Sequence, residues 1–315
     1  MLMDPRHLHI LSVIVDAGGM SDGARVLGKS QPGLSRIVAN LEARLGVPLF
    51  EKGRRPLVPT ELCIRLAQEG RLIGRATRAA QDIASQFSEG QVGRVRVAGT
   101  PIFMDGVVSS MIAAFQDAQP ELRVDQSYGY SAELIAALRS GTIDLGICPM
   151  VEEDVPDDLV FRSVLRGRNV IACGAGHPLA RRKSFRLEDI SEYPWITQPA
   201  GSPLSQDLRD VLASVGVRDF KVSYSGGSLS SILNVLAGSM ALTVLPYSVV
   251  YMQPRHTITA LPIRIRHPKR HLGLLSIRSR DRSPAVNRFT QHLVGQFDGI
   301  SRAIIDKQRQ QIWRA

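Results

Sequence analysis

The sequence has few of the residues that build catalytic, metal or disulfide sites. It holds only three cysteines, Cys63, Cys148 and Cys173, and they stand at no metal-ligand spacing. No Gly-x-Ser-x-Gly elbow, phosphate-binding loop or cluster of His, Cys and Asp with ligand spacing occurs. We therefore expect no catalytic residue, no cofactor and no metal.

Aromatic residues are also scarce, at 5% of the chain, and long apolar runs are missing. No run approaches the roughly 18 residues of a membrane span, and the N-terminus lacks the pattern of a signal peptide. We expect no membrane partner and a cytoplasmic location. Sparse cysteines suit a reducing compartment, and the strand-like surroundings of Cys148 and Cys173 favour buried packing over a redox pair.

Positive charge is in excess. The formal net charge is +10 and the isoelectric point is about 10.0, which favours an anionic partner such as nucleic acid. Basic residues also crowd the C-terminal part, which leaves open a solvated basic surface or a second docking face for DNA or for another subunit. They are Arg264, Arg266, Lys269, Arg270, Arg278, Arg280, Arg282 and Arg288.

The stretch from Ser30 to Phe50 has the marks of a single helix with one buried face. Ser30 suits the N-cap, and Pro32 fits the first turn, where no amide bond is lost. Gly46 and Pro48 end the helix. Apolar residues recur between them at helical spacing, namely Leu34, Ile37, Val38, Leu41 and Leu45.

Two shorter helices, Asp4–Ala17 and Met20–Gly28, precede this one, which gives the helix-turn-helix order of a DNA reader. Leu49–Thr60 then resembles a β-hairpin wing with a basic tip. The predicted DNA contacts on the third helix are Ser30, Gln31, Pro32, Ser35, Arg36 and Asn40, which suit base edges and phosphates. Those on the wing are Lys52, Arg54 and Arg55, which suit phosphate or a minor groove.

Many of these residues together resemble the N-terminal signature of LysR-type transcriptional regulators. The match is dense over about sixty residues, and the length and pattern of the rest fit the same family. It comprises Gly18-Gly19, Ala24, Leu27, Ser30-Gln31-Pro32, Ser35-Arg36, Leu41-Glu42, Leu45-Gly46, Pro48-Leu49-Phe50 and Pro59-Thr60.

Residues 61–89 predict one long helix with a heptad-like seam, formed by Leu62, Leu66, Ile73, Ala76, Ala80, Ile83 and Phe87. The alternatives are an amphipathic core helix and a dimerising linker. We favour the linker, because no second apolar face is evident nearby and a two-fold dimer would read two half-sites. The family resemblance implies a homotetramer built as a pair of dimers.

Strands and helices alternate from Arg94 onward, which predicts parallel, doubly wound sheets in two subdomains. The fold class is therefore α/β with an N-terminal all-α winged helix-turn-helix. Domains are expected at 1–60 (DNA-binding), 61–89 (linker helix) and 90–315 (effector-binding and oligomerisation). The resemblance implies a periplasmic-binding-protein-like pair, with lobe 1 at about 91–161 plus 267–301 and lobe 2 at about 162–266. The chain would cross near Phe161-Arg162 and near Ile265-Arg266.

Ligands of open α/β sheets lie beyond the carboxyl ends of strands, beside helix N-termini. Hydroxyls and amides there suit a carboxylate or sulfonate, although Ser and Thr are also ordinary helix caps. The candidate effector contacts are Thr100, Pro101, Ser131, Thr197, Gln198 and Ser228.

We interpret the chain as a transcription regulator that binds promoter DNA under the control of a small molecule. RNA polymerase is a candidate further partner. The alternative is a cytoplasmic solute-binding α/β protein, or an enzyme, with a basic N-terminal appendage. Missing catalytic motifs weigh against the enzyme, and the missing signal peptide weighs against the solute-binding protein.

Overall fold

The computed structural model describes residues 3–51, 53, 56–89, 93–182, 187–214, 216–217, 220–254, 256–263, 265–278 and 282–312. The chain forms two compact units, Met1–Arg94 with Ile135–Asp144, and Val95–Leu134 with Leu145–Ala315. None of the helices within the described ranges is both long and apolar enough to cross a membrane.

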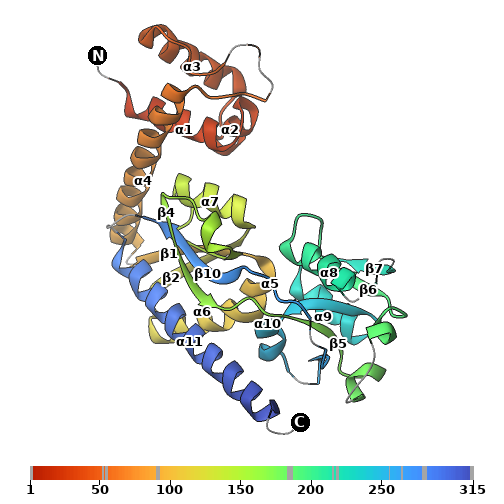
Figure 1. The fold of residues 1–315 in the computed structure, drawn as a ribbon. Helices are drawn as coiled ribbons and strands as arrows, with labels where there is room; N and C mark the ends of the chain where they lie inside the picture. Colours follow the sequence, from red (N-terminus) through yellow and green to blue (C-terminus); the bar gives the residue numbers. More distant parts are fainter. Residues whose placement is uncertain are drawn as a thin grey trace. The chain divides into compact units, whose positions relative to one another are not determined.

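The first unit begins with the three expected helices, α1 (Pro5–Asp16), α2 (Met20–Leu27) and α3 (Gln31–Leu45) (Figure 1). The Ser30 hydroxyl accepts the Gly33 N–H at 3.3 Å and begins α3. Gly28 and Gly46 end α2 and α3 with φ of 59° and 73°, a conformation that glycine adopts without strain. The core of this unit includes Leu11, Ile14, Ala24, Leu34, Val38, Leu41, Leu49 and Cys63.

The wing is confirmed as far as the described residues reach. Phe50 and Pro59 form an antiparallel bridge, and the Glu51 N–H donates to the Val58 carbonyl at 2.9 Å. The Glu42 carboxylate of α3 accepts the Leu49 N–H at 2.7 Å, which holds the hairpin to the helix. The basic tip residues Lys52, Arg54 and Arg55 lie outside the described residues.

The long helix α4 (Glu61–Glu89) has the predicted bounds, but one of its faces is covered by α1. The buried positions are Cys63, Ala67, Gly70 and Gly74. A Cβ at Gly70 would stand 1.9 Å from the Leu8 carbonyl oxygen, so only glycine allows this approach. Arg71 also donates two bonds to Asp16, at 2.6 and 3.0 Å. An apolar partner for α4 is thus present within the chain, contrary to our expectation.

The second unit contains two five-stranded sheets (Figure 1). The first has the order β2-β1-β3-β10-β4. Its strands are β1 (Gly93–Gly99), β2 (Leu122–Tyr128), β3 (Leu145–Met150), β4 (Leu159–Leu165) and β10 (His271–Ile277). Its helical segments are α5 (Pro101–Phe103), a π-helix at Met104–Val108, α6 (Ser109–Ala118) and α11 (Pro284–Ile312). The helix α7 (Ser131–Ser140) begins in the second unit and ends in the first.

The second sheet has the order β7-β6-β8-β5-β9. Its strands are β5 (Asn169–Gly174), β6 (Trp195–Thr197), β7 (Val222–Ser225), β8 (Leu242–Pro246) and β9 (Ile258–Ala260). The helices α8 (Pro203–Ser214), α9 (Leu229–Ala237) and α10 (Tyr247–Met252) accompany it. Short 3-10 turns lie at Glu152–Asp154, Pro178–Arg181 and Leu187–Ile190.

The α/β fold class is confirmed, but the strand directions are mixed. β1 pairs with β3, and β6 with β7 and β8, in parallel. β10 runs antiparallel to β3 and β4, and β5 runs antiparallel to β8 and β9. The expectation of parallel sheets fails for these pairs, because the two crossings bring strands from distant parts of the sequence together.

The first crossing falls at 166–168 rather than near Phe161-Arg162. Phe161 and Arg162 lie inside β4 and pair with Leu275 and Leu274 of β10. The ring of Phe161 lies over Gly273, where a Cβ would be 2.2 Å from its Cζ atom. The second crossing, at 261–270, contains Ile265-Arg266.

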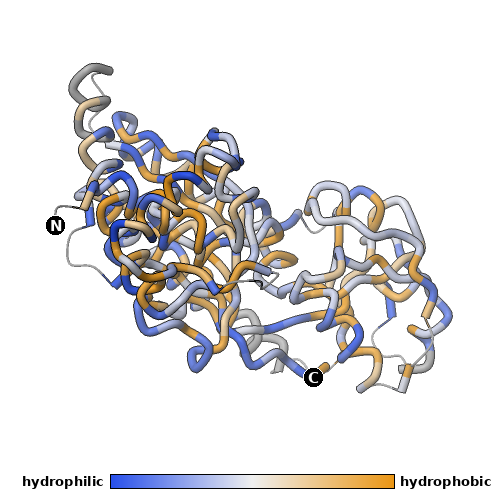
Figure 2. Tube along the Cα trace, turned by 90° about the horizontal axis from the view of Figure 1, so that it is seen from above, coloured by the Kyte–Doolittle hydropathy of each residue, from blue (hydrophilic) through white to orange (hydrophobic). Residues whose placement is uncertain are grey.

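Apolar packing continues from the first sheet to helices of the second. One cluster of buried side chains includes Val97, Met104 and Phe289 as well as Leu229 and Val249. Gly106 of the π-helix permits a close approach between the lobes, since a Cβ there would be 2.8 Å from Val249 Cγ1 and 2.9 Å from Leu229 Cδ2. Figure 2 shows hydrophobic and hydrophilic stretches alternating along the trace, the pattern of helices and strands that bury one face.

Candidate functional site

The outer face of α3 is exposed and polar. Its buried stripe, Leu34, Val38 and Leu41, faces the core of the first unit. The predicted DNA contacts Gln31, Pro32, Ser35, Arg36 and Asn40 are all exposed, as is the capping residue Ser30. Within the described chain no hydrogen bond or ion pair holds Arg36. A guanidinium in this state is available to phosphate or to a guanine edge.

In the second unit the two crossings lie side by side. The Gly167 N–H donates to the Nδ1 atom of His271 at 3.2 Å. A Cβ at Gly167 would be 2.0 Å from the Arg270 carbonyl oxygen, so glycine permits the close contact. This contact places the side chains of both crossings around one cavity between the sheets.

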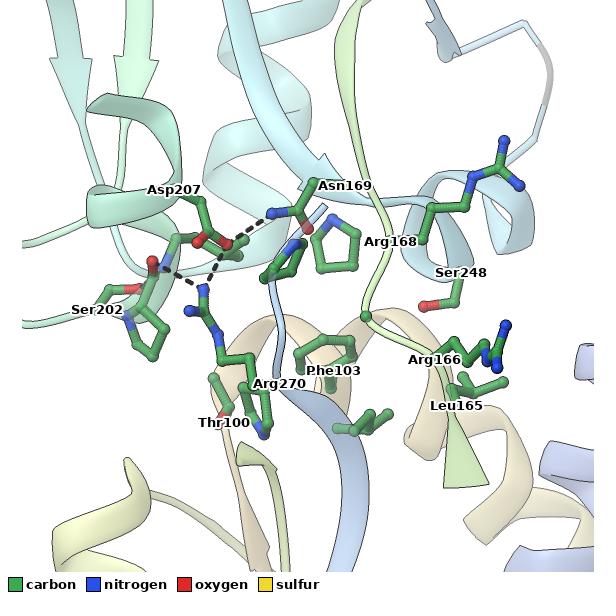
Figure 3. Close-up of a pocket in the computed structure, with 17 residues that line it drawn as sticks. Thr100, Phe103, Leu165, Arg166, Arg168, Asn169, Ser202, Asp207, Ser248 and Arg270 are labelled. Atoms are coloured by element: carbon green, nitrogen blue, oxygen red, sulfur yellow. Dashed lines mark hydrogen bonds and ion pairs between the residues drawn. The ribbon is translucent and has the colours of Figure 1, made fainter. Parts of the chain in front are cut away.

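A partly buried ion pair forms one wall of that cavity (Figure 3). Arg270, from the second crossing, pairs with Asp207 of α8, and these side chains are 22% and 8% exposed. Asp207 also accepts the Asn169 amide at 2.6 Å, and Arg270 donates to the Pro203 carbonyl at 3.1 Å. The Ser202 hydroxyl donates to the side chain of Gln198 at 2.7 Å.

The residues that line the cavity carry a net positive charge. Its charged lining residues are Arg166, Arg168, Arg270 and Asp207, three cations against one anion. Figure 3 shows Arg270 reaching toward Asp207, whereas Arg166 and Arg168 point away from that pair. The Arg168 guanidinium lies 5.0 Å from the ring centroid of Tyr247. Such a lining favours a negatively charged guest.

Two polar atoms of the cavity lining have no partner. The hydroxyl of Thr100, a residue only 3% exposed, makes no hydrogen bond, and neither does Nε of Arg168. Buried polar groups are nearly always hydrogen-bonded, so these two atoms are donors available to a ligand that accepts hydrogen bonds. Next to them, burial and then the charge of Arg168 lower the pKa of His267.

A second, more open groove of about 590 Å³ runs between α9 and the start of the π-helix. Its lining includes Pro101, Asp105, Tyr128, Ser228 and Ser230. The Tyr128 hydroxyl donates to Asp105 at 2.6 Å, and this hydrogen bond raises the pKa of Tyr128. Because Asp105 is the only charged lining residue, the groove suits anions less well than the cavity.

The six predicted effector contacts are therefore dispersed. Thr100 lines the cavity, while Pro101 and Ser228 line the groove. Thr197 donates to the Gln198 carbonyl at 3.1 Å, and Gln198 is buried behind Ser202. Ser131, at the start of α7, lines neither site. Ser228 caps α9 by accepting the Ser231 N–H at 3.5 Å, the alternative role considered for these hydroxyls.

The sequence did not identify the charged residues of the cavity wall, Arg166, Arg168 and Asp207, or the amide of Asn169. The available signal was the basic run beside the crossings, which we read as surface or docking charge. Arg270 instead lies in the cavity wall. Arg278 donates to the Asp157 and Leu159 carbonyls, both at 3.0 Å, and Arg282 donates to Ser276 at 2.6 Å. These arginines hold the fold together.

All three cysteines are free and buried. Burial raises the pKa of Cys148 and of Cys173 to about 12, and burial followed by the charge of Glu42 does the same for Cys63. The expectation of buried packing for Cys148 and Cys173 is confirmed. At neutral pH such thiols carry almost no thiolate, the form that reacts with oxidants.

Comparison with known families agrees with this geometry. The family described as "Bacterial regulatory helix-turn-helix protein, lysR family" matches residues 5–63, and "LysR substrate binding domain" matches residues 88–298. The chain belongs to the LysR family of transcriptional regulators. As a LysR-type regulator it combines a DNA-binding head with an effector-binding domain, and its relatives are regulators rather than enzymes.

Individual relatives of this LysR-type chain are distant but cover nearly its full length. The transcriptional dual regulator GltC of Bacillus subtilis is 25% identical over 95% of this chain and 99% of its own. A hydrogen peroxide-inducible genes activator of Dickeya chrysanthemi is 26% identical over 92% and 93%.

Solved structures share its fold. Full-length CbnR in complex with its target DNA has a TM-score of 0.54 at 20% identity and covers 93% of this chain and 100% of its own. A full-length OxyR variant from Pseudomonas aeruginosa has a TM-score of 0.58 at 18% identity over 94% and 95%.

Proposed function

We propose that this LysR-family regulator reads promoter DNA through the exposed face of α3 and responds to a small organic acid. The DNA part is carried by one observation, the exposed and unpaired Arg36 beside Gln31, Ser35 and Asn40. Arginine pairs in a bidentate manner with guanine, and glutamine or asparagine with adenine. We infer that the protein acts in the cytoplasm, because promoter DNA is found there.

We assign the acid to the cavity at Thr100 rather than to the groove at Ser228. The excess of arginine over aspartate and the unpaired Thr100 hydroxyl support an anion there. Both hydroxyl and guanidinium donate to a carboxylate or sulfonate, and charge-assisted bonds of this kind are the strongest in proteins. The acid would shift the equilibrium between two arrangements of the lobes only if it binds one arrangement more tightly than the other.

For oligomerisation we propose a dimer through the seam of α4 and a pair of such dimers. Leu62, Ala76 and Ala80 of the seam are exposed along the described helix, although α1 covers another face. The side chains of Ile83 and Phe87 lie outside the described residues. RNA polymerase is a candidate partner at the promoter.

The cysteines of this chain do not suit peroxide sensing, the role that the name of the Dickeya chrysanthemi activator indicates for that relative. These cysteines are buried, and burial holds the thiol pKa values near 12. A thiol that senses oxidants needs solvent access and a low pKa.

The Arg36→Ala substitution tests the reading helix. We expect binding to the DNA upstream of the protein's own gene to weaken by about 10-fold or more, since a bidentate base contact contributes roughly 1–3 kcal/mol. Fluorescence anisotropy of labelled DNA, repeated at several salt concentrations, measures the loss. Arg209→Ala, which removes the same charge from α8, should bind like the wild type. Unchanged binding by Arg36→Ala would contradict the assignment.

A further inference from the structure

The ion pair in the cavity connects elements that are far apart in the sequence. Arg270 belongs to the second crossing, whereas Asp207 lies on α8 of the second lobe. Two more bonds fix the pair, one from the Asn169 amide to Asp207 and one from Arg270 to the Pro203 carbonyl. Together they hold α8 against the crossing.

The cavity beside the pair is small. Its volume is about 30 Å³, which leaves room for only one or two water molecules. An organic acid does not fit without movement of the walls. Yet the Thr100 hydroxyl on the same cavity is 3% exposed and has no partner. The Thr100 hydroxyl is therefore a free donor in the lining, but the cavity is too small for an acid that would accept from it.

We propose that Asp207 is an internal competitor of the effector, and that its carboxylate occupies the position on Arg270 that the acid's carboxylate takes on binding. This inference rests on the proposed acid-binding function. Among the described residues Asp207 is the only anionic one of the lining, so no other described side chain can play this part. The guest would carry at least one carboxylate or sulfonate, which accepts from Arg270 and from Thr100.

The replacement of Asp207 by the acid on Arg270 would also move part of the structure. A buried carboxylate that loses its cationic partner is strongly destabilised, because an uncompensated charge is left in the protein interior. Asp207, with an exposure of 6%, therefore has to reach solvent when the guest takes Arg270. Because Asp207 sits on α8, that helix moves away from the crossing. Binding of the acid is thereby coupled to the arrangement of the lobes.

The experiment compares the full-length wild type with Asp207→Asn, which keeps the shape of the side chain but removes the competing charge. Benzoate, succinate and methanesulfonate serve as probes, and ligand-observed NMR in low-chloride buffer gives their affinities. We expect the variant to bind at least one probe about tenfold more tightly or better. Adding Arg270→Gln to it should abolish that binding.

Asp210→Asn is the matched control, since it removes a carboxylate one turn further along α8, where Asp210 accepts from Gln206 at 2.8 Å. It should behave like the wild type. Thermal unfolding verifies that each variant is folded. Should Asp207→Asn not fold, Asn169→Ala removes the 2.6 Å bond that holds the carboxylate and should raise probe affinity in the same direction.

The outcomes separate the two proposals. If the wild type binds a probe and the variants at Asp207 or Asn169 bind it no more tightly, the exchange is refuted while the acid-binding function stands. If no probe binds to any folded variant, and all still bind DNA, the anionic effector is refuted and the exchange with it.

Discussion

Single side chains determine much of the chemistry open to this regulator. Arg36 is exposed on α3 and has no protein partner within the described chain, whereas Arg270 forms an ion pair with Asp207. The same residue type thus acts in two ways. The difference comes from burial, because a guanidinium enclosed by protein must have a partner and an exposed one does not.

The cysteines yield a prediction at this scale. With thiol pKa values near 12 for Cys63, Cys148 and Cys173, the folded chain should react with a disulfide reagent at least 100-fold more slowly than the same chain in guanidinium chloride. Absorbance during labelling measures both rates. Peroxide treatment should leave DNA binding unchanged. Rapid labelling of the native protein, or a loss of DNA binding with peroxide, would show an accessible thiol.

At the scale of elements, the first unit depends on a close approach between two helices. α4 meets α1 at Gly70 and Gly74, where a Cβ would be 1.9 Å from the Leu8 carbonyl oxygen and 2.5 Å from the His9 ring. Heptad spacing in α4 identifies one apolar face, yet these small residues form another. In a sequence, glycines within a helix indicate low helix stability. In this structure Gly70 and Gly74 form the surface that contacts α1.

Gly70→Ala should therefore destabilise the first unit, by about 2–3 kcal/mol, since overpacking outweighs the gain of about 1 kcal/mol that alanine normally gives a helix. Urea denaturation monitored by circular dichroism measures the change. Gly295→Ala in α11 is the control. Nothing lies within 4 Å of a Cβ there, so that variant should be as stable as the wild type or more stable. Equal gains from both substitutions would exclude the close approach.

The seam of α4 leads to a second prediction for an element. Ala76→Glu with Ala80→Glu places charge on two exposed seam positions while keeping good helix formers. We expect the protein to lose its dimer, seen by analytical ultracentrifugation, and to bind a two-half-site DNA about 10-fold or more weakly. Ala79→Glu, about 60° around the helix from Ala76 and about 100° from Ala80, should change neither. A dimer that survives the double change would place the interface elsewhere.

For the whole molecule, the decisive feature is the pair of crossings between sheets. Gly167 and His271 bring them together, and their flanking arginines then line one cavity. A ligand that loosens Asp207 from Arg270 acts on the only segments that join the two sheets within the described part of the chain. If the proposed acid binds there, we expect it to change the arrangement of the lobes.

The sequence by itself determined the helix-turn-helix, because caps, glycine stops and apolar spacing act within a few residues of one another. Ser30, Gly46 and the Leu34–Leu41 stripe are local signals of this kind. It likewise indicated most strands and helices of the second unit. The strand β4 and the three-residue strand β9 were not predicted, and both pair with strands that are distant in the sequence.

Only the tertiary structure decided which side chains meet in the cavity. Asn169, Asp207 and Arg270 are separated by tens of residues, and no local pattern marks them as partners. Their meeting depends on antiparallel pairing of β10 with β3 and β4 and on the glycine at 167, which lets the crossings touch. The sequence shows how many charged residues the chain has. The fold determines whether each of them faces solvent, DNA or another charged residue.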